Sequence, residues 1–195
     1  MIKILLTIFW FFHFTNNTNP RESRPNKKSI LIGDSNVSVI KSTRGFREGG
    51  VNPTVWKVGI STRKLIGMIR GTKPDSSITT VFVAIGTNDG YIGDISSNLK
   101  LQLIKTYPNA KELYVIWGSR GWGGVKHSTV DQQSRFYRKF EESGFKQIRV
   151  TTGHFSNSNS AHLPNSPFFL EIVNKITLIV KKGHVSYQLQ SFPEQ

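Results

Sequence analysis

The sequence contains no cysteine among its 195 residues, which excludes a disulfide scaffold and any metal site built from thiolates. Acidic residues are also scarce, because 12 Asp and Glu stand against 26 Lys and Arg and leave a net charge of +14. The basic residues never form a run of five, so they indicate a solvated basic surface that attracts anionic partners. No recognition motif for nucleic acid accompanies this charge, and we do not expect a nucleic-acid-binding protein.

A long hydrophobic run is missing as well. The most apolar stretch, residues 4–14, follows a positive charge at Lys3 and is shorter than the about 20 residues of an ordinary membrane span. This pattern predicts a secretory signal peptide at residues 1–15 and a secreted or lumenal protein. An uncleaved anchor and a buried N-terminal element are the alternatives, and membrane contact is expected only through an uncleaved segment.

The rest of the chain has the composition of a globular protein, with 37% hydrophobic and 19% charged residues overall. We expect a polar basic linker at residues 16–28, one domain at 29–183 and a tail at 184–195. Short apolar runs within the domain predict strands, and most of them end at a glycine. The runs are Ile30–Ile32, Val55–Val58, Val81–Ile85, Leu113–Trp117 and the weaker Ile148–Val150.

Helical patterns separate these runs. Their expected N-caps are Ser61, Asp94, Thr129 and Ser166, and Gly183 is the expected end of the last helix. The alternation predicts an α/β protein with three α/β/α layers. Its sheet should be flavodoxin-like, with about five mostly parallel strands and helices on both faces.

Glycines, with polar residues beside two of them, follow three of the predicted strands at the edge where such sheets bind ligands. They lie in Gly33-Asp34-Ser35, at Gly59 and in Gly86-Thr87-Asn88-Asp89. Ser35 would lie at a helix N-terminus, which favours developing negative charge, although a serine there is more often an N-cap. The Asn88 amide would suit an oxyanion, but an Asx-turn explains it equally well.

A histidine at the same edge supplies a candidate base. His162 lies in Asn159-Ser160-Ala161-His162, between the fifth strand and the last helix. A loop histidine is usually only solvated, and spacing alone does not rank His162 above His127 and His154.

Together these blocks resemble the SGNH, or GDSL-type, hydrolase family over roughly residues 29–182. The resemblance implies that Ser35 attacks an ester carbonyl and that His162 takes its proton and passes it to the leaving group. It implies an oxyanion hole made of the Ser35 and Gly59 N–H groups and the Asn88 side chain. No cofactor and no metal are implied.

One position departs from the family pattern, because Asn159 stands where the family has an aspartate. In the analogous triad, this change costs about 10⁴ in rate. Three interpretations follow: a Ser–His dyad supported by a backbone carbonyl, another carboxylate such as Asp131, or a weakened site that only binds.

The resemblance further implies small acyl esters as substrates, often O-acetyl groups on carbohydrates, or lipids. Trp122 could stack on a sugar, although it could equally pack under its own loop, and Arg120 would suit an acidic glycan; Asp34 is a further candidate for substrate binding. The alternative function is a non-catalytic protein that binds glycan or another anionic polymer. Asn36-Val37-Ser38 is a formal glycosylation sequon that we expect to be unmodified, because a glycan there would block the site.

Overall fold

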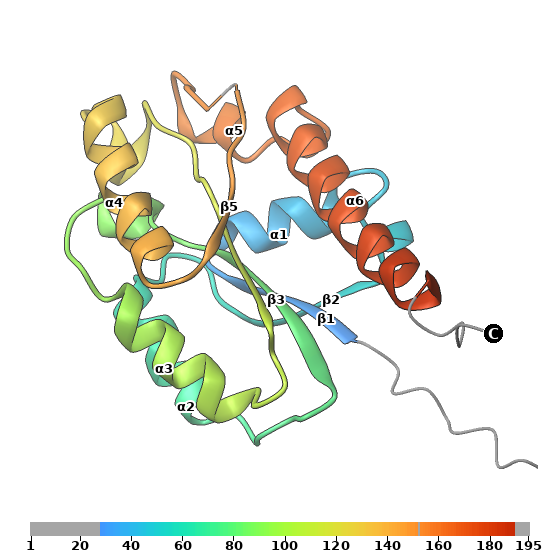
Figure 1. Ribbon diagram of the computed structural model, residues 1–195. Coiled ribbons are helices and arrows are strands. Elements are labelled where there is room, and N and C mark those ends of the chain that lie inside the picture. The colour runs from blue at the N-terminus through green and yellow to red at the C-terminus, as the bar shows by residue number, and fades with distance from the viewer. Residues whose placement is uncertain (1–27, 152, 190–195) are drawn as a thin grey trace, which may run out of the picture.

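The computed structural model describes residues 28–151 and 153–189, so the predicted signal peptide and nearly all of the predicted linker lie outside the described residues. Five strands form one parallel sheet in the order β2-β1-β3-β4-β5 (Figure 1). They are β1 (Lys28–Gly33), β2 (Val51–Trp56), β3 (Ile78–Ala84), β4 (Glu112–Ile116) and β5 (Lys146–Ile148). This strand order is flavodoxin-like, which confirms the predicted fold class.

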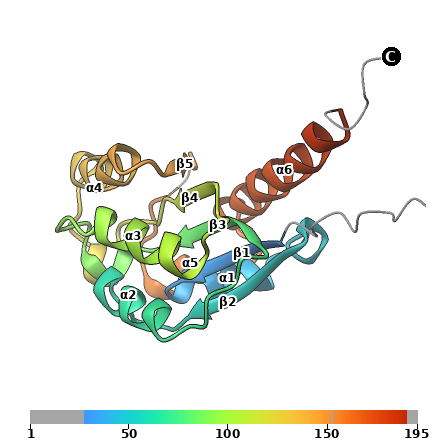
Figure 2. The same cartoon turned by 60° about the horizontal axis from the view of Figure 1, so that its bottom comes forward.

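Helices cover both faces of the sheet (Figures 1 and 2). One layer contains α1 (Ser35–Ser42) and α6 (Pro167–Leu189), and the other contains α2 (Thr62–Arg70), α3 (Ser96–Thr106) and α4 (Val130–Glu142). The alternation of side chains along the strands separates two hydrophobic cores. In β1, Ile30 and Ile32 join the core under α2, α3 and α4, whereas Leu31 joins the core under α1 and α6.

Two strands lie earlier in the chain than their apolar runs predict. β2 begins at Val51 and contains Pro53, which the sheet accommodates because β2 is an edge strand and proline has no N–H to donate. β5 begins at Lys146 and ends at Ile148. Both errors have one cause: edge strands bury less surface, so their hydrophobic pattern marks their bounds poorly.

Some of the predicted helix ends are confirmed and others are wrong. Thr129 caps α4 by accepting a hydrogen bond from Gln132 N, as expected, and α6 begins at Pro167 directly after Ser166. The prediction for Asp94 is wrong: the N-cap of α3 is Ile95. The prediction for Gly183 is also wrong, because α6 continues past it to Leu189. A Cβ added at Gly183 would have no atom within 4 Å, so no close contact requires a glycine there.

Within the described residues, no helix is long and apolar enough to span a membrane. Two short elements follow strands at the carboxyl edge and matter for the site: the 3₁₀ helix η2 (Thr87–Asp89) and the helix α5 (Ser158–Ala161).

Candidate active site

Ser35 is the first residue of α1, immediately after the chain leaves β1. The turn requires glycine at position 33, where φ is +145° and an added Cβ would lie 1.9 Å from the Ala84 carbonyl oxygen. As the first helical residue, Ser35 has no acceptor within α1 for its N–H. The nucleophile candidate therefore stands at a helix N-terminus with a free backbone donor.

His162 lies against Ser35. Its Nε2 is 3.2 Å from the Ser35 Oγ, and its Nδ1 is 2.8 Å from the backbone carbonyl oxygen of Ser158. Because a carbonyl only accepts, Nδ1 carries the proton and Nε2 is the unprotonated nitrogen that receives the Ser35 hydroxyl. The ring is thus held in the tautomer that a general base needs.

The turn that presents His162 is built locally. The Asn157 side chain caps α5 by accepting from Ser160 N at 2.9 Å, and the His162 N–H donates to the carbonyls of Ser158 and Asn159. This places the Ser158 carbonyl under the imidazole. Which residue supplies this carbonyl cannot be predicted from a residue pattern, because a backbone group can come from any residue type.

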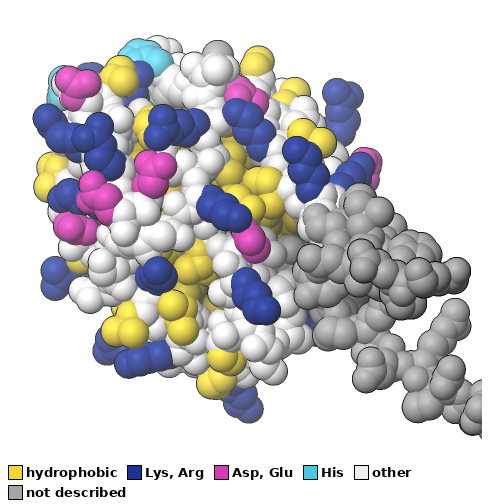
Figure 3. All heavy atoms as spheres, in the orientation of Figure 1, with side chains coloured by type: hydrophobic (Ala, Val, Ile, Leu, Met, Phe, Trp, Pro, Cys, Tyr) yellow, Lys and Arg dark blue, Asp and Glu magenta, His cyan; other side chains and the backbone are white. Residues whose placement is uncertain are grey.

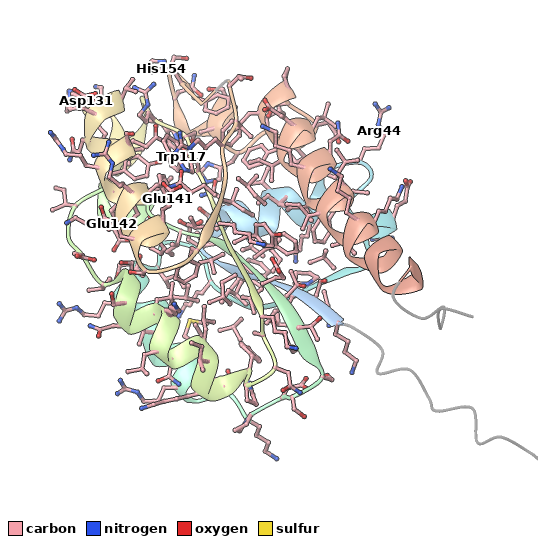
Figure 4. The ribbon with its side chains drawn as sticks, viewed as in Figure 1. Arg44, Trp117, Asp131, Glu141, Glu142 and His154 are labelled. Carbon is pink, nitrogen blue, oxygen red and sulfur yellow. The ribbon has the colours of Figure 1, made fainter. Side chains whose placement is uncertain are left out.

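Asn159 does not orient the imidazole. Its side chain is exposed and forms no hydrogen bond with a described residue, while the Ser158 carbonyl takes the place beside Nδ1. Asp131 lies in the first turn of α4 with an exposed side chain, and Figure 4 shows it at the outer end of that helix. Of the three interpretations, the geometry matches the dyad with a backbone carbonyl.

The competing histidines lie elsewhere on the surface. His127 and His154 are exposed, and Figure 4 shows His154 at the surface. The backbone of His154 pairs with that of Arg120 in an isolated β-bridge. Of the three candidate histidines, His162 is the one that forms a hydrogen bond with Ser35.

Trp122 packs against the other side of His162. The two ring centroids are 4.6 Å apart with an edge-on angle of 77°, and the indole Nε1 donates to the Ser119 Oγ at 2.7 Å. The ring is partly buried, and besides supporting the imidazole it packs against the core under α2, α3 and α4. Its neighbour Arg120 has a buried Nε without a hydrogen-bond partner.

Each of the three predicted oxyanion donors has an N–H for which no acceptor is found among the described residues. The Gly59 N–H donates to no described residue, and its φ of +71° requires the conformation that glycine adopts readily. Asn88 uses one of its two amide hydrogens on Asp34, at 3.1 Å, which leaves the second free.

Asp34 lies beneath these donors and is fully buried. Its Oδ1 accepts from the Asn36 backbone and side-chain nitrogens, and its Oδ2 accepts from Thr87 and Asn88. Burial raises the pKa of this carboxyl from 3.8 to about 6, against the lowering effect of its hydrogen bonds. A side chain so enclosed offers no surface to a substrate, so the expected substrate-binding role of Asp34 is wrong.

Asn36 belongs to the same buried cluster. It is 4% exposed, and its Nδ2 donates to Asp34 at 2.9 Å. The nitrogen that a glycan would modify is therefore inside the protein, which agrees with the expectation that this sequon is unmodified.

Asp89 is a structural residue that the sequence patterns did not single out. Its carboxylate accepts from the Thr62 N–H at 3.1 Å and from the Thr62 Oγ1 at 2.6 Å. It therefore caps α2 from outside, whereas Ser61 occupies the N-cap position without a side-chain bond. This contact ties the loop after β3 to the loop after β2, which carries Gly59.

A separate hollow of about 300 Å³ lies at the opposite end of α1 from Ser35. Figure 4 shows Arg44, one of its lining residues, beside α6 and away from His154 and Asp131. In the described part of the chain, no cluster of three or more His, Asp or Glu residues is arranged to hold a metal ion.

No protein-family model matches this sequence, and no curated protein sequence does either. Solved structures do match. A GDSL-like lipase from Bacteroides thetaiotaomicron is 14% identical with a TM-score of 0.60, over 81% of this chain and 89% of its own. A candidate acylhydrolase from Bacteroides fragilis is 14% identical with a TM-score of 0.60, over 80% and 88% of the two chains.

A third match is an α/β hydrolase enzyme from the metagenome of Lake Arreo in Spain, 15% identical with a TM-score of 0.51. It covers 79% of this chain and 96% of its own. Together with the parallel sheet in the order β2-β1-β3-β4-β5, these similarities show that the chain has the SGNH, or GDSL-type, hydrolase fold.

Proposed function

We propose that the protein is a serine esterase that hydrolyses small acyl esters, with O-acetyl groups on carbohydrate as the preferred class. The observation that carries this proposal is the contact of 3.2 Å between the Ser35 Oγ and the unprotonated Nε2 of His162. A hydroxyl with a base at this distance is an activated nucleophile.

The reaction follows from this geometry. Nε2 takes the hydroxyl proton as Oγ attacks the ester carbonyl, and the N–H groups of Ser35 and Gly59 with the free Asn88 N–H stabilise the oxyanion. His162 then protonates the leaving alcohol and the acyl group stays on Ser35. Water, deprotonated by His162, releases the acid and restores the enzyme.

A backbone carbonyl stands where a triad has a carboxylate, and this makes His162 a weaker base. The Ser158 carbonyl holds the tautomer as a carboxylate would, but it brings no full negative charge to stabilise the imidazolium. We therefore propose turnover that is slower than that of a full triad.

The substrate class rests on the surroundings of the imidazole. The partly exposed Trp122 offers an aromatic surface suited to a sugar, and the net charge of +14 favours substrates that carry acidic groups. The apolar segment at residues 4–14 supports the further proposal that the enzyme acts in a secretory lumen or outside the cell.

The test compares wild type, Ser35→Ala and the control Ser38→Ala, which alters a serine of the same helix. With p-nitrophenyl acetate, we expect Ser35→Ala to lose activity by about 10³-fold or more and Ser38→Ala to retain it. Equal rates for wild type and Ser35→Ala would refute the proposal. Release of acetate from acetylated xylo-oligosaccharides, compared with longer p-nitrophenyl esters, tests the substrate class.

A second candidate function is a weakened protein that binds glycan without turnover. The observation that favours it is the absence of a carboxylate at His162 Nδ1 among the described residues. A fluorophosphonate reagent separates the two, because it labels an activated serine covalently. Labelling of Ser35 would count against a binding-only protein, whereas glycan binding without labelling would support it.

A further inference from the structure

A carboxylate is buried between the nucleophile and the oxyanion hole, and the reaction proposed above does not use it. Asp34 precedes Ser35 in the chain and is 0% exposed. Four neutral groups donate to it: the Asn36 N–H and Nδ2 at 2.9 Å each, the Thr87 Oγ1 at 2.7 Å and the Asn88 Nδ2 at 3.1 Å. No described cation pairs with it. Such an arrangement is costly, because burial disfavours the charged form.

An N-cap alone would not need this arrangement. Capping α1 uses only Oδ1, through the Asn36 N–H, and a serine or an asparagine would serve as well. The second oxygen reaches across to η2, where it binds Thr87 and Asn88. The carboxylate therefore joins two segments of the site that lie more than 50 residues apart in the chain.

Ionised Asp34 also dictates which way the Asn88 amide faces. A carboxylate accepts hydrogen bonds and donates none, so only the NH₂ end of Asn88 can point toward it. One N–H is then held by the Asp34 Oδ2, and the other stays free for an oxyanion. A flipped amide would instead set two acceptors against each other.

We propose that Asp34 is a positioning residue of the oxyanion hole: it fixes the Asn88 amide and holds the α1 N-terminus so that both present an N–H to the same oxyanion. This inference rests on the proposed esterase function. Asp34 does not touch the substrate and acts only through Asn88 and Ser35.

Two titratable phenols feel the charge of this carboxyl. Burial, and to a smaller extent the charge of Asp34, raise the pKa of Tyr91 and of Tyr137 above the usual range, so both stay neutral at physiological pH. The groups that contact Asp34 from α1, η2 and β3 are Asn36, Thr87, Asn88 and the Ala84 carbonyl, none of which is charged. Asp34 is thus the titrating group of its own cluster.

The kinetic test is a double-mutant cycle between Asp34→Asn and Asn88→Ala. The first variant replaces the acceptor by an amide that can turn its own NH₂ toward Asn88. We expect each single variant to lower kcat, by about tenfold or more for Asp34→Asn and about a hundredfold for Asn88→Ala, with KM little changed. The double variant should lose less than the product of the two single losses, because part of the effect of Asp34 passes through Asn88. Multiplicative losses would overturn the proposal.

Asp75→Asn is the matched control. This carboxylate accepts from the Ser77 N–H at 2.9 Å at the amino end of β3, remote from the site, and we expect it to leave kcat unchanged. Where Asp34→Asn fails to fold, Thr87→Val removes a single donor from the carboxylate and should also lower kcat.

A measurement independent of turnover separates this proposal from the proposed function. In NMR spectra, the Asn88 side-chain amide of the wild type should titrate with pH near 6, where Asp34 ionises. Thr87→Val should move that titration to higher pH, because it removes a hydrogen bond that stabilises the ionised form of Asp34. An Asn88 amide that does not titrate overturns the positioning role even in an active enzyme. Conversely, a titrating amide in a protein without Ser35-dependent activity refutes only the esterase.

Discussion

At the scale of single residues, His162 is oriented by a group that no residue pattern reveals. Its Nδ1 lies 2.8 Å from the Ser158 carbonyl, and the side chain of Asn159 points to solvent. The blocks around Ser35, Asn88 and His162 allowed the reacting groups to be predicted, because their side chains carry the chemistry. A backbone carbonyl was one of the three predicted partners of the imidazole, but neither its identity as Ser158 nor the burial of Asp34 could be predicted, since both depend on how the turn at 157–162 and the loop after β3 fold against α1.

This geometry predicts that Asn159→Asp has little effect on activity. The imidazole already has an acceptor at Nδ1, and an exposed carboxylate is screened by water, so we expect kcat/KM within about threefold of wild type. Asn98→Asp, which adds the same charge at an exposed position of α3, is the control. A rate increase of about a hundredfold or more would show instead that a carboxylate at 159 reaches the ring.

Asp34 also predicts an unusual pH dependence of stability. Because burial raises its pKa from 3.8 to about 6, the native state binds more protons than the unfolded state between these values. The contribution of Asp34 to the free energy of unfolding therefore falls as pH rises through this window, by about 3 kcal/mol at 1.4 kcal/mol per pKa unit. Urea unfolding of wild type and Asp34→Asn at pH 4 and pH 7 measures it. Relative to wild type, the free energy of unfolding of Asp34→Asn should be higher at pH 7 than at pH 4. A difference between the two proteins that is equal at both pH values would contradict the raised pKa of Asp34.

At the scale of elements, all five strands were predicted, but the runs for the two edge strands lie later in the chain than the strands themselves. β1, β3 and β4 contain all or nearly all of their apolar runs, because central strands bury most of their side chains, although β3 begins three residues before its run. β2 lies at an edge, where exposed positions and Pro53 interrupt the pattern. The cap of α2 comes from Asp89, 27 residues away, and no local signal at Ser61 reveals such a partner.

A buried phenol joins the exits of β3 and β4. The Tyr137 hydroxyl of α4 donates to the Ile85 carbonyl at 2.8 Å and accepts from the Gly118 N–H at 2.7 Å. Tyr137→Phe leaves both backbone groups buried and unpaired, so we expect a loss of about 1–3 kcal/mol in the free energy of unfolding. Tyr114→Phe is the control, because its hydroxyl bonds the partly exposed Glu112 and no buried backbone group among the described residues, and it should change stability by less than about 0.5 kcal/mol. Equal losses in urea unfolding would argue against a role for this bridge.

At the scale of the whole molecule, the excess of positive charge is spread rather than gathered. Figure 3 shows Lys and Arg side chains distributed over the face that includes α3, α4 and α6, with Asp and Glu between them. The described ion pairs are few and solvent-exposed, such as Lys146 with Glu112, and contribute little to stability. On this face, such a distribution acts as a long-range field.

This field predicts how salt affects catalysis. A net charge of +14 concentrates anionic substrates near the protein, and the effect weakens as the Debye length shortens. Between about 20 mM and about 500 mM salt, we expect the KM of an acetylated acidic oligosaccharide to rise severalfold while kcat stays constant. A neutral acetylated xylo-oligosaccharide is the control and should keep its KM. If both substrates responded alike, salt would be acting on the site itself. If neither responded, the charge of this protein would serve purposes other than substrate capture.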